Sequence, residues 1–237
     1  MASPPILILG MHRSGTSCLA GSLQQRGLFL GTVYESRPYN RKGNREHQQV
    51  MDLNDAVLAA SGGAWDRPPA ALRWSAAEAE GRDAFAAAME TASQGSAWGF
   101  KDPRTLLTLP FWRERLADAR LVGTFRHPAR VARSLVARDP SMAFDAALDL
   151  WRDYNRKLLE LHAGVPFPLV DFDTGPADYV ATVDALATGL GLPGRDGPEE
   201  FFEEDLRTDA LPAGRAVPAG HAALHAALQA AAWRPAA

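Results

Sequence analysis

The chain has 237 residues, of which 46% are apolar, and its formal net charge is -3. This length and apolar content suit one sizeable core, so we expect a single domain over residues 1–237. This net charge does not favour binding to nucleic acid or to an anionic membrane. The sequence also contains no run of about 20 apolar residues, the length needed to span a bilayer. The N-terminus lacks the basic start of a signal peptide, and the lone Cys18 cannot form an intramolecular disulfide. We therefore expect a cytoplasmic protein without nucleic-acid or membrane partners, and leave a homo-oligomer open.

Strand and helix patterns alternate along the chain. This alternation predicts an α/β fold, P-loop-like and three-layered, in which helices flank a central parallel sheet. The expected strands are short apolar runs at Ile6–Leu9, Trp98–Lys101, Leu121–Phe125 and Phe167–Phe172. The expected helices are Thr16–Arg26, His47–Ala60, Glu78–Ala92, Pro128–Arg138, Ala143–His162, Ala177–Leu190 and Ala219–Trp233. The many Gly and Pro residues between 189 and 198 predict a loop.

A glycine-rich loop, Gly10–Ser17, directly follows the first strand. Such a turn before a helix can wrap an anion with backbone N–H groups and the helix N-terminus. A Walker A loop would carry a lysine where Thr16 stands, and the cation lies instead inside the loop, at Arg13. The pattern therefore predicts an anion site without the lysine of ATP and GTP chemistry. Its candidate residues are His12, Arg13, Ser14, Gly15, Thr16 and Ser17.

A second candidate site lies where the third strand meets its helix. Arg126 ends the strand, Pro128 suits the first helical position, and Ser134 lies about two turns into the helix. Arginine suits a terminal phosphate because its planar guanidinium donates two charge-assisted hydrogen bonds. We interpret the neighbouring Arg130 and Arg133 as solvated residues of the helix face.

Two further segments carry charged residues beside predicted elements. Lys101-Asp102-Pro103-Arg104 follows the second strand, and Lys42–His47, which contains Glu46, precedes the second predicted helix.

Together these motifs resemble sulfotransferases that use 3′-phosphoadenosine 5′-phosphosulfate (PAPS), in particular a bacterial branch with a GxxRSGTS loop and a KDPR motif. The resemblance runs from about residue 6 to residue 172. It implies that the Gly10–Ser17 loop holds the 5′-phosphosulfate, that Arg126 and Ser134 bind the 3′-phosphate, and that Lys101 lies beside the transferring group. The implied reaction moves a sulfuryl group from PAPS to a hydroxyl of a small-molecule or carbohydrate acceptor, releases 3′,5′-bisphosphoadenosine and needs no metal.

In this reaction Arg13 and Lys101 would stabilise the charge that develops during transfer. The resemblance places Glu46 facing the loop from a helix start, so Glu46 is the first candidate for the base that accepts the hydroxyl proton. The alternatives are His47, Asp102 and Glu35. A competing interpretation is structural, because a carboxylate in the first turn of a helix favourably meets the helix dipole.

Two other function classes remain open at this stage. A P-loop kinase of a small metabolite would share the fold but needs the Walker lysine that Thr16 replaces. A non-catalytic nucleotide-binding module would need Arg126 and Ser134 but neither Lys101 nor Glu46. The acceptor is not specified by any pattern, although four aromatic residues are candidates for stacking on it: Tyr34, Tyr39, Trp65 and Trp74.

Overall fold

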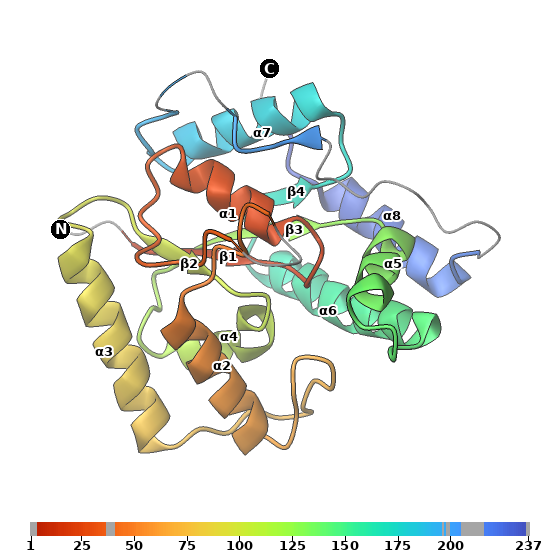
Figure 1. The fold of residues 1–237 in the computed structure, drawn as a ribbon, viewed down its shortest axis with the longest axis horizontal. Coiled ribbons are helices and arrows are strands. Elements are labelled where there is room, and N and C mark those ends of the chain that lie inside the picture. Colours follow the sequence, from red (N-terminus) through yellow and green to blue (C-terminus); the bar gives the residue numbers. More distant parts are fainter. Residues whose placement is uncertain (1–3, 37–40, 196, 198–199, 205–215, 236–237) are drawn as a thin grey trace.

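Four parallel strands form the centre of the computed structural model, which describes residues 4–36, 41–195, 197, 200–204 and 216–235. The strand order is β2-β1-β3-β4, and every pairing is parallel (Figure 1). The strands are β1 (Ile6–Leu9), β2 (Gly99–Lys101), β3 (Arg120–Phe125) and β4 (Leu169–Asp171). Helices flank the sheet, so the predicted α/β class is confirmed.

The helices divide between the two faces of the sheet. They are α1 (Thr16–Gln24), α2 (Gln48–Ala60), α3 (Ala76–Ala92), α4 (Thr105–Arg113), α5 (Pro128–Arg138), α6 (Phe144–Gly164), α7 (Pro176–Gly189) and α8 (Ala219–Ala231). Successive side chains of a strand point to opposite faces. Accordingly Ile6 and Ile8 join a core with α1 and α7, whereas Leu7 and Leu9 join a larger core with the remaining helices. Figure 1 shows α1 and α7 on one side of the sheet and α2, α4 and α6 on the other.

The helix α4 was not predicted. Its sequence contains Pro110, which removes one backbone hydrogen bond and argues against a helix interior. Burial outweighs that cost, since Leu106, Phe111 and Trp112 are each at most 1% exposed. The other helices begin and end within a few residues of the expected positions. Of the predicted loop 189–198, residues 196 and 198 lie outside the described residues.

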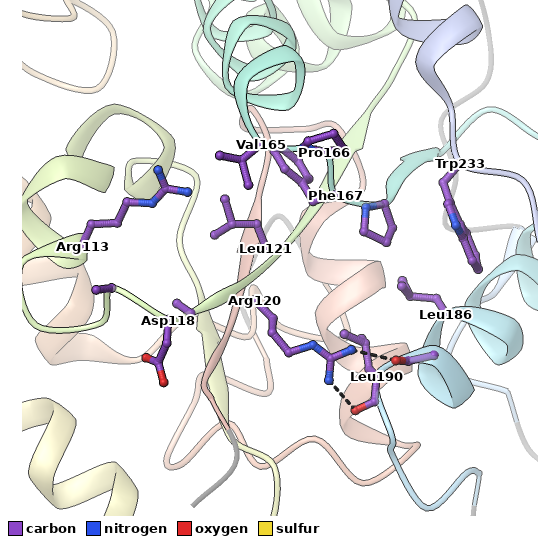
Figure 2. Close-up of a pocket in the computed structure, with 14 residues that line it drawn as sticks. Arg113, Asp118, Arg120, Leu121, Val165, Pro166, Phe167, Leu186, Leu190 and Trp233 are labelled. Carbon is purple, nitrogen blue, oxygen red and sulfur yellow. Dashed lines mark hydrogen bonds between the residues drawn. The ribbon is translucent and has the colours of Figure 1, made fainter.

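A cavity of about 700 Å³ lies at the edge of the sheet where the strands begin (Figure 2). Arg120, the first residue of β3, lines it and donates hydrogen bonds to the carbonyl oxygens of Gly189 and Leu190. The glycine-rich loop follows the opposite, carboxyl end of β1. The cavity is therefore separate from the predicted anion site. No helix in the described part of the chain combines the length and the hydrophobicity needed to cross a bilayer.

Asn54 on α2 is a buried polar link to α4. Its side-chain nitrogen donates to Oγ1 of Thr105 at 3.1 Å, and its side-chain oxygen accepts from Oγ1 of Thr108 at 2.6 Å and from Nε1 of Trp112 at 2.8 Å. Because buried polar groups lose water on folding, each of these bonds must be made within the protein. Asn54 therefore fixes how α2 lies on α4.

We predict that Asn54→Ala lowers the free energy of unfolding by at least about 2 kcal/mol, because it leaves the buried indole N–H of Trp112 without its acceptor and breaks the bonds to Thr105 and Thr108. Urea denaturation measures this change. The control Asp52→Ala alters an exposed residue of the same helix and should cost no more than about 0.5 kcal/mol. Equal losses in the two variants would show that the buried network does not hold α2 and α4 together.

Candidate active site

Two glycines let the loop between β1 and α1 turn tightly. Gly10 has a φ of 150° and Gly15 a φ of 85°, both in the region that favours glycine. A Cβ at Gly10 would lie 2.5 Å from the backbone oxygen of Thr124, and one at Gly15 would lie 2.3 Å from Cγ of Phe172. Gly15 also caps α1 without a side-chain hydrogen bond. The first N–H groups of α1, which begins at Thr16, are thereby suited to an anion at the carboxyl edge of the sheet.

Arg13 connects this loop to α5. Its backbone is left-handed, with a φ of 66°, and its Nε donates a 2.7 Å hydrogen bond to Oγ of Ser134. The two residues are 121 positions apart in the chain. The structure thus brings together two residues that the sequence assigned to the two phosphate groups of one nucleotide.

Two further arginines carry positive charge near Arg13. Burial lowers the pKa of Arg13, and the positive charges of Arg138 and Arg126 lower it further. Like charges held close together disfavour one another, and a bound anion would relieve that repulsion. Arg138 was not among the predicted site residues. It ends α5, one helical turn beyond Ser134, and this spacing was the signal in the sequence that could have identified it.

Arg126 is buried at the end of β3 and is held by Asp173. Its Nε lies 3.2 Å from Oδ1 of Asp173, which Nη1 of Arg130 also contacts at 2.6 Å. The other carboxylate oxygen accepts from the backbone N–H of His127 at 2.7 Å. Although burial opposes the shift, the bonds from His127 and Arg130 lower the pKa of Asp173, which keeps it ionised. The interpretation of Arg130 as a solvated residue was wrong, because it binds this carboxylate.

Asp173 is a second residue that sequence analysis missed. It follows β4, and the carboxyl ends of parallel strands meet at one edge of a sheet. An acidic residue at that place, after the Asp171 that ends the strand, was the available signal.

Lys101 and Glu46 form a buried ion pair that joins the end of β2 to the segment before α2. Lys101 ends β2, its side chain is 1% exposed, and its Nζ lies 2.6 Å from Oε1 of Glu46 and 3.3 Å from Oγ of Ser17. The second oxygen of Glu46 accepts from the side-chain amide of Asn44. Glu46 precedes the N-cap residue of α2, so its expected place in the first helical turn was wrong. Glu46 is linked to the loop by Lys101, which contacts Ser17. It does not lie within α2, where a carboxylate would interact with the helix dipole.

The other candidate bases are already engaged in the fold. His47 is the N-cap of α2, where its Nδ1 accepts from the N–H of Gln49 at 3.2 Å, and burial lowers its pKa. Asp102 accepts from the backbone and the side chain of Arg104, both at 2.8 Å. Burial raises the pKa of Asp102 to about 6 despite the neighbouring guanidinium. Glu35 is exposed and pairs with Arg45.

His12 and Ser14 are buried polar residues of the loop. The ring of His12 packs 4.6 Å from that of Trp65, centroid to centroid, and 6.2 Å from that of Tyr154. Neither Nε2 of His12 nor Oγ of Ser14 has a hydrogen-bond partner among the described residues. Buried polar atoms of this kind call for a ligand or a functional explanation.

The four candidate acceptor aromatics differ in their surroundings. Trp65 faces His12, whereas the ring of Trp74 packs against Phe111 and the hydroxyl of Tyr34 donates to Gln48. Tyr39 lies outside the described residues. Within the described part of the chain, no group of three or more His, Cys, Asp or Glu side chains is arranged to hold a metal ion.

A family model described as "Sulfotransferase family" matches residues 4–196. The chain belongs to this family. The match includes every predicted site residue of the sulfotransferase, from His12 in the loop to Ser134 on α5.

Two solved sulfotransferase structures resemble this one in fold. The sulfotransferase domain of the olefin synthase from Synechococcus PCC 7002 aligns with a TM-score of 0.61 and 18% identity, over 99% of this chain and 96% of that domain. A sulfotransferase from Alicyclobacillus acidocaldarius aligns with a TM-score of 0.51 and 18% identity, over 97% of this chain and 96% of that one. No curated protein matches this sulfotransferase.

We predict that Glu46→Gln lowers the free energy of unfolding by about 3 kcal/mol, because it leaves the buried Lys101 without a countercharge. In a double-mutant cycle, Glu46→Gln combined with Lys101→Met should cost less than the sum of the single changes. Thermal or urea unfolding measures the free energy of unfolding of the wild type, of each single variant and of the double variant. The control Glu90→Gln breaks the more exposed pair with Arg115 and should cost less than about 1 kcal/mol. Additive losses in the Glu46 and Lys101 variants would show that the pair is not coupled.

Proposed function

We propose that this sulfotransferase transfers the sulfuryl group of PAPS to a hydroxyl of a small-molecule or carbohydrate acceptor. The observation that carries the proposal is the meeting of Arg13, Ser134 and Arg126 beside a glycine turn at the carboxyl edge of the sheet. A nucleotide with anionic groups at both ends suits such an arrangement, since one set of cations lies in the loop and another follows β3.

The described residues fit this donor in two respects. Thr124 and Phe172 lie so close to Gly10 and Gly15 that neither position has room for a side chain, so an anion can approach the backbone there. The cluster of Arg13, Arg126 and Arg138 supplies the countercharge. In the proposal, residues 13–17 hold the 5′-phosphosulfate, and Arg126 with Ser134 holds the 3′-phosphate.

Charge stabilisation is the proposed catalytic contribution of Arg13 and Lys101. As the acceptor oxygen bonds to sulfur, the bond from sulfur to the 5′-phosphate oxygen breaks and negative charge grows on the leaving group. Cations already fixed by the fold stabilise that charge without reorganising. Lys101 is fixed by Glu46 and Ser17 at the start of α1, and Arg13 is fixed by Ser134.

The two competing functions have less support. A P-loop kinase would carry a lysine at position 16, which is Thr16, and a carboxylate for Mg²⁺. A non-catalytic nucleotide module would have no need of a buried lysine beside the loop, yet Lys101 contacts Ser17. We place the protein in the cytoplasm on the grounds of its single, unbridged Cys18.

We predict that 3′,5′-bisphosphoadenosine raises the melting temperature far more than adenosine 5′-phosphate does, because only the former carries the phosphate assigned to Arg126 and Ser134. Arg126→Ala should remove most of that difference, since loss of a charge-assisted hydrogen bond costs about 1.5–3 kcal/mol, or about tenfold to a hundredfold in affinity. Differential scanning fluorimetry and calorimetric titration measure both effects.

The matched control is Arg152→Ala, which removes an arginine of α6 that pairs with Asp149 and Asp153. It should leave the preference for the bisphosphate unchanged. Equal stabilisation by the two nucleotides would refute the assignment of the 3′-phosphate site, and a preference for ATP with Mg²⁺ would favour the kinase.

We predict that Arg13→Ala and Lys101→Ala each lower kcat by about 10²-fold or more, because each removes a charge that acts mainly in the transition state. A screen of sugars, phenols and other hydroxylated compounds with labelled PAPS identifies the acceptor for the assay. The affinity of the Lys101 variant for bisphosphoadenosine should fall less than its kcat. Sulfate transfer at the parental rate by Lys101→Ala would assign the lysine a purely structural role.

A further inference from the structure

Glu46, Asp102 and His47 each accept hydrogen bonds within the fold. Both oxygens of Glu46 accept hydrogen bonds, one of them from the ammonium of Lys101. Both oxygens of Asp102 accept from Arg104, and Nδ1 of His47 accepts from the start of α2. Each of these atoms would have to give up a hydrogen bond within the protein before it could take a proton from an acceptor. A polar atom of the loop that has no such partner is therefore a better candidate.

His12 has the opposite environment. Its residue is 8% exposed, and its Nε2 accepts no hydrogen bond from any described residue. It is adjacent in sequence to Arg13, which places the imidazole at the proposed phosphosulfate loop. Beyond it lie Trp65, from the segment between α2 and α3, and Tyr154 of α6, whose hydroxyl donates to the backbone oxygen of Trp65 at 2.8 Å. His12 thus lies between the loop and an aromatic wall.

We propose that His12 accepts the proton of the acceptor hydroxyl at Nε2, and that the acceptor binds between the loop and the Trp65 segment. This inference rests on the proposed function. In the step, the hydroxyl oxygen bonds to sulfur, the bond from sulfur to the 5′-phosphate oxygen breaks, and the proton moves to His12. Bisphosphoadenosine leaves with the electron pair of the broken bond, and the imidazolium then returns its proton to solvent. Half-buried Trp65 favours an acceptor with an apolar or ring face beside its hydroxyl.

The charges that face His12 come from several elements. Four of them are positive. Arg13 lies in the loop, Lys101 ends β2, Arg104 follows β2, and Arg138 ends α5. The neighbour on α6 is Tyr154, whose pKa burial raises well above its usual value, so that it stays neutral. Burial lowers the pKa of His12 well below its ordinary value, and the four cations add to that effect. His12 is therefore in its neutral, proton-accepting form at neutral pH.

A bound nucleotide changes this balance. An anion beside Arg13 offsets the cations, so the imidazolium becomes less unfavourable and His12 becomes a stronger base. The donor would in this way activate the base that serves the acceptor.

The first experiment follows the ring signals of the six histidines by NMR titration with and without bisphosphoadenosine. The midpoint of His12 should rise by about one pH unit or more when the nucleotide binds, because an opposite charge within about 4–6 Å produces shifts of that size. The midpoint of His162, near the end of α6, should not move. An unchanged midpoint for His12 in the nucleotide complex would overturn the proposal. This test uses the wild-type protein and needs no acceptor.

The second experiment uses His12→Gln and His12→Asn with the acceptor found by the screen. In the wild type, kcat should rise with pH through the His12 midpoint and then level off, because only neutral imidazole accepts the proton. Either variant should lose about 10²-fold in kcat and lose that rise with pH, while its stabilisation by bisphosphoadenosine persists. The control His162→Gln should keep the wild-type profile.

These outcomes separate the inference from the proposed function. A His12 variant with the parental rate, or one that keeps the rise with pH, would limit His12 to packing against Trp65. Absence of any stabilisation of the wild type by bisphosphoadenosine would instead refute the donor assignment itself.

Discussion

The positive charge gathered around the arginine of the glycine-rich loop is the constraint on which the site depends. Arg13, Arg126 and Arg138 come from a loop, a strand end and a helix end, and burial together with the charges of the other two arginines lowers the pKa of Arg13. Such an arrangement is costly unless an anion completes it. Asp173 neutralises part of it by binding Arg126 and Arg130, and Ser134 fixes the guanidinium of Arg13. The remaining positive charge lies beside the glycine turn and the N-terminus of α1.

The parallel sheet is what brings these groups together. Arg13 follows β1, Lys101 ends β2, Arg126 follows β3 and Asp173 follows β4. All four therefore lie at the carboxyl edge of the sheet, where ligands bind in open α/β folds. The site then divides into two sides. In the proposed arrangement, Arg126 and Ser134 hold the nucleotide on one side, and His12 and Trp65 lie beside the acceptor on the other.

Much of this arrangement could be predicted from the sequence, because its signals are local. The apolar runs, with the Gly, Pro and Ser residues that mark the ends of elements, identified four strands and seven helices. The loop was recognisable from Gly10, Arg13 and Gly15. The helix α4 was missed because Pro110 argues against it locally, and only the burial of residues such as Phe111 and Trp112 shows why it forms. Asp173 and the engagement of Glu46 by Lys101 depend on which strand ends meet, and that information is tertiary.

A crystal structure of the protein with 3′,5′-bisphosphoadenosine tests the central claim most directly, because the claim concerns which phosphate lies where. The account predicts that the 3′-phosphate accepts hydrogen bonds from Arg126 and Ser134 while the 5′-phosphate lies against the N–H groups of residues 15–17. A nucleotide bound in the reverse orientation, or bound away from the loop, would contradict it.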